Sequence, residues 1–265
     1  MEQYSKKMNS FKNNRTGYTL IILTLLIAVI AVFSLAPIAQ DTGYHAFSDQ
    51  RTLLGISNIY NVLSNLPFLI VGLYGLYCLI IRKNLNGADE FKIAYLLLFT
   101  GIALVSVGSG YYHLTPNNQT LAWDRLPIAI GIMALLSIVI SEFISLHIAR
   151  GLLLPLITLG IVSVCYWQLS ESSGAGDLRL YILVQFLSAL LTAIILLNFK
   201  SKYTSAMGYW WVLISYTLAK LLEHFDEAIH IFTGFISGHS LKHAVAAAGL
   251  YLLITYYKNR QLRKE

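Results

Sequence analysis

The stretch DRLPIAIGIMALLSIVISEFISLH, residues 124–147, is mostly apolar along its length. A helix needs about 20 mostly apolar residues to cross the hydrocarbon core of a membrane. The composition of the whole chain agrees, because its 265 residues are 56% hydrophobic and only 12% charged. A soluble domain carries about 25% charged residues. The stretch therefore predicts a transmembrane helix in an all-α membrane protein.

Seven further stretches have a similar length and composition. The eight predicted spans are residues 18–38, 58–81, 91–112, 124–147, 151–168, 178–198, 209–231 and 239–257. The segments between them are polar or rich in Gly, Asn and Ser, which is typical of turns. Because unpaired backbone groups are not tolerated in lipid, spans of this length predict a helix bundle. We expect a seven-transmembrane-helix bundle with one additional N-terminal transmembrane helix.

The additional helix divides the chain into two predicted parts. Residues 1–57 form a basic lead, the transmembrane helix and an outer loop, and residues 58–265 form the seven-helix core. A basic lead before an apolar run is also typical of a signal peptide. We favour a retained helix, because the apolar run is long and the segment APIAQD, residues 36–41, is a poor cleavage site. The core keeps the same orientation in either case.

The basic residues predict the orientation of the helices. With the N-terminus inside, 14 of the 19 Lys and Arg residues fall on the cytoplasmic side, as the positive-inside rule requires. They are Lys6, Lys7, Lys12, Arg15, Arg82, Lys83, Lys92, Arg150, Lys200, Lys202, Lys258, Arg260, Arg263 and Lys264. Both termini are then cytoplasmic. The net charge of +6 is explained by anchoring at the membrane surface, and no nucleic-acid partner is expected.

Polar residues of several predicted spans gather on the opposite, extracytoplasmic side. Ionisable groups inside a membrane are costly, so they are treated as functional candidates. Chance would divide them between the two sides. The candidates are Asn61, Ser64, Asn65, Ser109, His113, Asp124, Lys220, Glu223, Asp226, His239 and His243.

The spacing of the histidines predicts a metal site. His239 and His243 are four residues apart and share a helix face, as do Ser109 and His113. Three histidines with one open position form a catalytic zinc arrangement, in which the metal lowers the pKa of its bound water to about 7. Asp124 would orient that water or carry its proton, and Ser109 would donate to a developing oxyanion. We expect one Zn²⁺ per chain.

Each feature also has a simpler interpretation. A histidine pair four residues apart can serve packing or capping, and His113 can complement the dipole at a helix end. Asp124 suits the N-cap of the predicted 124–147 helix. Asn61, Ser64 and Asn65 can form hydrogen bonds between helices. The shared depth of all these residues favours the metal site.

Three motifs carry a resemblance to a known family. NVLSNLPF (61–68), SGYYH (109–113) with Asp124, and GHSLKH (238–243) resemble the alkaline ceramidase family. That family belongs to a superfamily of seven-helix membrane hydrolases that also includes the progestin and adiponectin receptors. The resemblance covers residues from about 58 to 257 and implies a zinc ion held by His113, His239 and His243, with Ser109 and Asp124 at the reaction centre. The implied activity is hydrolysis of a ceramide-like N-acyl lipid to a free fatty acid and an amine base.

The chain departs from the family pattern at two places. Asn58 replaces a glutamate, and Asp49 is the only acid in the preceding segment, so no calcium site is expected. On the sixth core helix, Glu223 and Asp226 replace a Trp and Asp pair. We expect Glu223 and Asp226, together with Lys220, either to bind a polar head group or to form a buried ion-pair network. Lys242 is expected to extend to the membrane interface.

Other functions remain open at this level. The superfamily also suggests a receptor or sensor that retains the zinc site, although short cytoplasmic loops offer no domain for a partner. A lipid hydrolase acting on a different amide or an ester is a further alternative. A haem cytochrome would have no use for Ser109 and Asp124, and a Schiff base on Lys220 or Lys242 would define a retinal protein or transporter. We expect a membrane lipid substrate and no obligatory protein partner.

Overall fold

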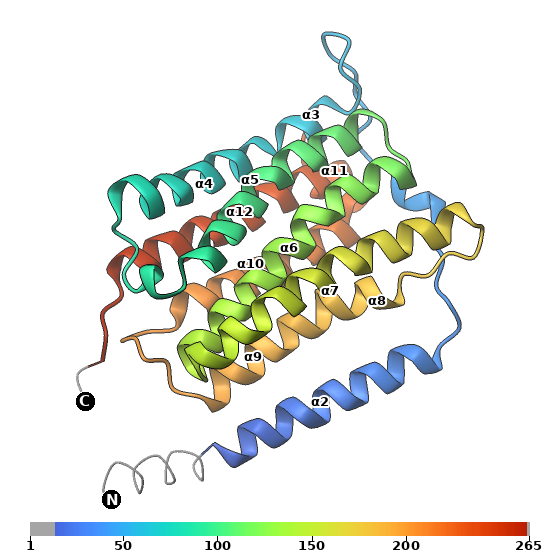
Figure 1. Ribbon diagram of the computed structural model, residues 1–265. Coiled ribbons are helices and arrows are strands. Elements are labelled where there is room, and N and C mark those ends of the chain that lie inside the picture. The colour runs from blue at the N-terminus through green and yellow to red at the C-terminus, as the bar shows by residue number, and fades with distance from the viewer. Residues whose placement is uncertain (1–13, 264–265) are drawn as a thin grey trace, which may run out of the picture.

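The computed structural model describes residues 14–263 and is built from helices, without a β-strand in that range. The all-α prediction is therefore confirmed (Figure 1). The helices are α2 (Arg15–Ser34), α3 (Ile59–Leu63), α4 (Leu66–Leu76), α5 (Lys92–Leu114), α6 (Asn118–Phe143), α7 (Leu146–Ser172), α8 (Arg179–Ile182), α9 (Ser188–Asn198), α10 (Met207–His224), α11 (Asp226–Thr233) and α12 (Gly238–Asn259). Short 3-10 turns η1 (Thr42–His45) and η3 (Ala88–Phe91) precede core helices, and π-helical turns η2 (Tyr77–Arg82) and η4 (Leu183–Leu187) extend α4 and join α8 to α9.

The core is a bundle in which consecutive long helices pack as antiparallel neighbours. α4 packs on α5, α5 on α6, α6 on α7, and α12 closes the bundle against α10 and α4. Helix α2 lies along the outside and packs on α9, where the Tyr18 and Phe199 rings meet with centroids 5.1 Å apart (Figure 1). Most of the apolar side chains of α2 are exposed, as expected for a helix surrounded by lipid.

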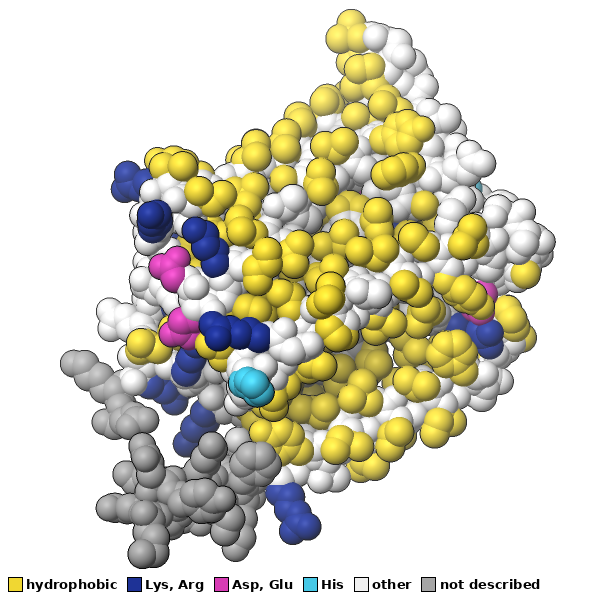
Figure 2. All heavy atoms as spheres, in the orientation of Figure 1, with side chains coloured by type: hydrophobic (Ala, Val, Ile, Leu, Met, Phe, Trp, Pro, Cys, Tyr) yellow, Lys and Arg dark blue, Asp and Glu magenta, His cyan; other side chains and the backbone are white. Residues whose placement is uncertain are grey.

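Within residues 14–263, six helical segments are long and apolar enough to cross a membrane. They are 15–34, 59–82, 88–114, 118–143, 146–172 and 179–198. α10 and α12, of 18 and 22 residues, are less apolar because they carry ionisable residues such as Lys220, Glu223 and Lys242. Figure 2 shows a broad apolar surface across the middle of the bundle, with Lys and Arg gathered near the chain termini. These features indicate a multi-pass membrane protein.

Three predicted helix bounds were wrong. α6 begins at Asn118, because Asn117 caps it and forms a capping box with Thr120. Asp124 therefore lies inside the helix, and its interpretation as an N-cap is excluded. α7 begins at Leu146, where the Ser145 side chain accepts from the backbone of Ile148. The predicted 209–231 helix is broken at Phe225 into α10 and α11.

Two glycines allow the helices that carry candidate residues to approach closely. A Cβ atom on Gly108 of α5 would lie 2.1 Å from the backbone oxygen of Trp123 in α6. A Cβ atom on Gly238 would lie 2.2 Å from the backbone oxygen of Leu222 in α10. Small residues of this kind let helix backbones touch in membranes. They bring Ser109 toward Asp124 and the start of α12 toward α10.

Candidate metal centre

Three histidines from two helices meet at one end of the bundle. His113 lies near the end of α5, and His239 and His243 lie in the first two turns of α12. Their ring centroids are 4.9 Å (113–239), 5.2 Å (239–243) and 5.3 Å (113–243) apart. One nitrogen from each ring lies within 4.8 Å of the others. All three side chains are buried, so the arrangement could hold a metal ion.

The hydrogen bonding of these rings fits a metal site. Nδ1 of His113 and Nε2 of His239 are buried and have no hydrogen-bond partner among residues 14–263. Buried polar atoms are normally paired, so such atoms call for a ligand. Nδ1 of His243 is 2.8 Å from the Ser64 hydroxyl, which orients the ring and leaves Nε2 for a metal. Three neutral imidazoles are a donor set that zinc accepts.

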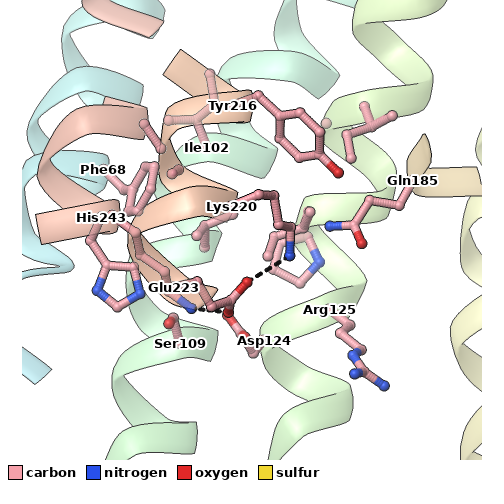
Figure 3. Close-up of a pocket in the computed structure, with 18 of the residues that line it drawn as sticks. Phe68, Ile102, Ser109, Asp124, Arg125, Gln185, Tyr216, Lys220, Glu223 and His243 are labelled. Atoms are coloured by element: carbon pink, nitrogen blue, oxygen red, sulfur yellow. Dashed lines mark hydrogen bonds and ion pairs between the residues drawn. The ribbon is translucent and has the colours of Figure 1, made fainter. Parts of the chain in front are cut away.

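The carboxylate and hydroxyl predicted for catalysis lie beside the histidines. The Ser109 hydroxyl lies next to the Asp124 carboxylate, which it can reach as a hydrogen-bond donor (Figure 3). Both residues face the same cavity as His243. The structure thus brings together the five residues predicted for the metal site and the reaction.

The cavity next to these residues has a volume of about 430 Å³ and a mostly apolar wall. Its apolar lining includes Phe68, Ile102, Ile132, Leu135 and Leu250, from four helices. Its polar groups include Ser109, Asp124, Arg125, Gln185, Lys220 and Glu223 (Figure 3). An apolar chamber with a few polar groups is typical of a site for a small amphipathic ligand.

One wall of the cavity carries a three-residue ion-pair cluster. The Lys220 Nζ atom is 2.8 Å from Oε2 of Glu223, and Lys242 forms an ion pair with the other oxygen of Glu223. The Tyr44 hydroxyl donates to the same carboxylate at 3.0 Å. The prediction that Lys242 reaches the membrane interface was wrong, because its side chain is 15% exposed and binds Glu223 across the α10–α12 contact.

The other predicted polar residues lie behind the site and connect chain segments. The Asn61 amide donates to the backbone oxygen of Asp49 and accepts from the Ser240 hydroxyl. Asn65 donates to the backbone oxygen of Asn61. The Asp226 carboxylate accepts the backbone N–H of His239 at 2.7 Å, so it fixes the start of α12. These three residues do not line the cavity.

The segment 36–57, which joins α2 to α3, crosses the site, and this was not predicted from the sequence. Phe47 packs on His113 and His239, with both ring centroids 4.7 Å away. The backbone N–H of Ser48 donates to Asp226 at 3.0 Å. The only sequence signal was a dense mixture of aromatic and polar residues at YHAFSD, residues 44–49. This segment, which includes η1, is part of the site's wall.

Asp49 in this segment is bound by an arginine. The Arg51 guanidinium is 2.5 Å from Oδ2 of Asp49. Burial raises the pKa of the Asp49 carboxyl, but the hydrogen bonds and charge of Arg51 outweigh it and hold the pKa below its usual value. The carboxylate is thus already neutralised by a side chain of the same segment.

One comparison with known proteins identifies a family for this chain. A protein-family model described as Ceramidase matches residues 52–265, which is most of the chain. Comparison with curated proteins found no match. The matched region contains His113, Asp124, His239 and His243, but it excludes α2 and most of the segment 36–57.

Proposed function

Because this chain belongs to the ceramidase family, we propose that it is an integral-membrane, zinc-dependent amidohydrolase of a ceramide-like N-acyl lipid. The products are a free fatty acid and an amine base. Family membership supports a hydrolase of lipid amides. One observation supports the zinc ion and the site: one nitrogen from each of three buried histidines lies within 4.8 Å of the others, beside Asp124 and a mostly apolar cavity.

Each residue of the site has a separate role in the proposed reaction. His113, His239 and His243 would hold the zinc ion, which acidifies water and polarises the lipid carbonyl when bound. Asp124 takes a proton from the attacking water and returns it to the departing amine nitrogen. The Ser109 hydroxyl donates to the carbonyl oxygen as negative charge develops there. One C–O bond forms and one C–N bond breaks, so one water is consumed for each amide.

We also propose that the site faces the extracytoplasmic side, with both termini cytoplasmic. The support is the distribution of charge: Lys and Arg gather at the end of the bundle where the chain termini lie (Figure 2). Lys92 begins α5 and His113 lies near its other end, and Lys258 lies near the end of α12 whereas His239 lies at its start. That asymmetry follows the positive-inside rule, and it places the amide bond of an outer-leaflet lipid within reach. In this topology the seven core helices and α2 each cross the membrane once.

Metal analysis of purified protein tests the first half of the proposal. We expect about one zinc per chain, which His239→Ala removes, since two histidine ligands hold zinc poorly in a three-histidine site. His147→Ala is the matched control, because His147 is exposed on α7 and lies outside the cluster. Freshly purified wild-type protein without zinc would contradict the proposal.

A panel of N-acyl lipids and lipid esters, with products detected by mass spectrometry, tests the second half. We expect release of fatty acid from the amides, lost by at least about 10²-fold in Asp124→Asn, because the proton carrier is removed. Asp89→Asn, an exposed carboxylate at the opposite end, serves as the control. Hydrolysis of the esters alone would favour a different lipid hydrolase. Zinc-loaded protein that leaves the whole panel intact would favour a receptor or sensor.

A further inference from the structure

Arg125, which the reaction does not use, is a buried cation on the wall of the same cavity. It follows Asp124 on α6 and is only 7% exposed. Its Nη2 atom donates to Oε1 of Gln40 at 2.6 Å. The guanidinium lies over the Trp167 ring at 4.1 Å and the Tyr181 ring at 4.9 Å. The side chain is therefore held in place from several directions.

No carboxylate forms an ion pair with this guanidinium among the residues that the structure describes, and the neighbouring Asp124 carboxylate interacts with its charge only at longer range. Arg125 forms no ion pair, and its Nη1 atom is buried without a hydrogen-bond partner. Glu223 is bound by two lysines, and Glu171 accepts from the Gln40 backbone and from Trp167. An unpaired buried charge is costly, and within a membrane it marks a functional site. A ligand that neutralises this guanidinium would have to be an anion.

A second uncommitted polar group projects into the same cavity. Gln185 lies on the π-helical turn η4, and such turns often occur at functional sites. Its amide has no hydrogen bond to any described residue, and it points toward Lys220 across the cavity (Figure 3). Lys220 already shares Glu223 with Lys242. The polar wall thus presents three cations, Arg125, Lys220 and Lys242, against Asp124 and Glu223.

We propose that Arg125, assisted by Gln185, binds an anionic head group of the lipid substrate. The chemical class is an oxyanion: a carboxylate, phosphate or sulfonate close to the amide bond. The guanidinium fork suits such oxygens, and the aromatic rings on its faces keep it oriented. Asp124 and Arg125 are neighbours on one helix, so the head group and the reacting amide share one chamber. This inference rests on the proposed function, because it names the substrate class of that site.

Matched lipids test the inference in the purified full-length protein. The substrates are pairs of N-palmitoyl lipids that share one long-chain amine and differ only in a neutral hydroxyl or an anionic phosphate or sulfonate. We expect wild-type protein to prefer the anionic lipid in kcat/KM by roughly 10- to 100-fold, the worth of a charge-assisted hydrogen bond. Arg125→Gln should abolish that preference and leave turnover of the neutral lipid within a few fold. Arg150→Gln, an exposed arginine on α7, should retain the wild-type preference.

Binding measured without turnover separates this inference from the proposed function. Hexadecylphosphonate should raise the Tm of wild-type protein in neutral detergent, hexadecanol should not, and Arg125→Gln should lose the shift. If the anion binds through Arg125 but no amide is cleaved, the proposed function fails and the anion site stands. If amides are cleaved with no preference for an anionic head group, the inference is overturned.

A structural role for Arg125 predicts a different pattern. In that case Arg125→Gln would lower kcat/KM equally for both lipids, which would also overturn the inference. If Arg125→Gln does not fold, Arg125→Lys retains the charge without the planar fork. It should keep the neutral activity and lower the anionic preference partway. An unchanged preference in Arg125→Lys and in Gln185→Leu would refute the assignment.

Discussion

Replacing Gly108 with alanine should separate Ser109 and Asp124, the two side chains proposed for catalysis, without removing either of them. The added Cβ atom would lie 2.1 Å from the backbone oxygen of Trp123 and 2.8 Å from the backbone carbonyl carbon of the same residue, whereas ordinary contacts begin near 3.4 Å. Both of these atoms belong to the backbone and cannot move aside as a flexible side chain could. Helices α5 and α6 must therefore move apart by about 1 Å. A displacement of that size near a reacting centre costs about 10²-fold in rate. Overpacking should also cost about 1–3 kcal/mol of stability.

The position of the three histidines makes the result specific. None of them lies on α6, so a displaced α6 moves Asp124 and leaves the three histidines together. We expect Gly108→Ala to keep about one zinc per chain and to lose about 10²-fold in kcat for the N-acyl lipid.

Gly110→Ala provides a matched control for this substitution. Gly110 lies two residues further along α5, and a Cβ atom there would meet nothing within 4 Å. Alanine is also the better helix former, so activity and Tm should be at least as high as in the wild type. A folded Gly108→Ala protein with full activity, or an equal loss in Gly110→Ala, would refute the close-approach argument.

Three further substitutions probe the supports of the site and of the bundle. Ser64→Ala removes the hydrogen bond to His243 and should lower zinc affinity by roughly tenfold, measured by competition with a chelator; unchanged affinity would contradict the orienting role. Glu142→Gln leaves the fully buried Arg260 without its ion partner and should cost about 3 kcal/mol, seen as a lower Tm at unchanged zinc content. Hydrogen bonds from Arg179 lower the pKa of the Asp177 carboxyl to about 2. The ion pair therefore stabilises the fold above about pH 4, and this stabilisation is lost as the pH falls toward 2. The Tm difference between wild type and Asp177→Asn should therefore shrink over that range, and a constant difference would argue against the ion pair.

The architecture was largely predictable because lipid imposes length and composition on each helix. The bounds were less predictable where a helix extends beyond the apolar run. Residues 118–123 look like a loop by polarity, yet the Asn117–Thr120 capping box makes them the first turns of α6. Hydropathy measures the transfer of side chains into lipid, and it contains no information about backbone groups paired by a cap.

The clustering of the three histidines was predictable in part because the spacing of two of them is local. His239 and His243 share a face through the helix repeat alone, and topology placed His113 and Asp124 at the same depth. The contacts of Arg125 and Phe47 depend on segments far apart in the chain, so periodicity could not reveal them. The pairing of Lys242 with Glu223 likewise required the close packing of α10 on α12, which spacing within one helix does not report.

The segment 36–57 is tethered at both ends, by α2 on one side and α3 on the other. A group that is tied close to its contact site is present there at a high effective concentration, in the millimolar range for a short flexible link. Phe47 and Tyr44 are therefore held against the histidines and Glu223 by the chain itself. Cutting the link near residues 36–41 should loosen these contacts, because the segment would then be tied to the bundle through α3 alone.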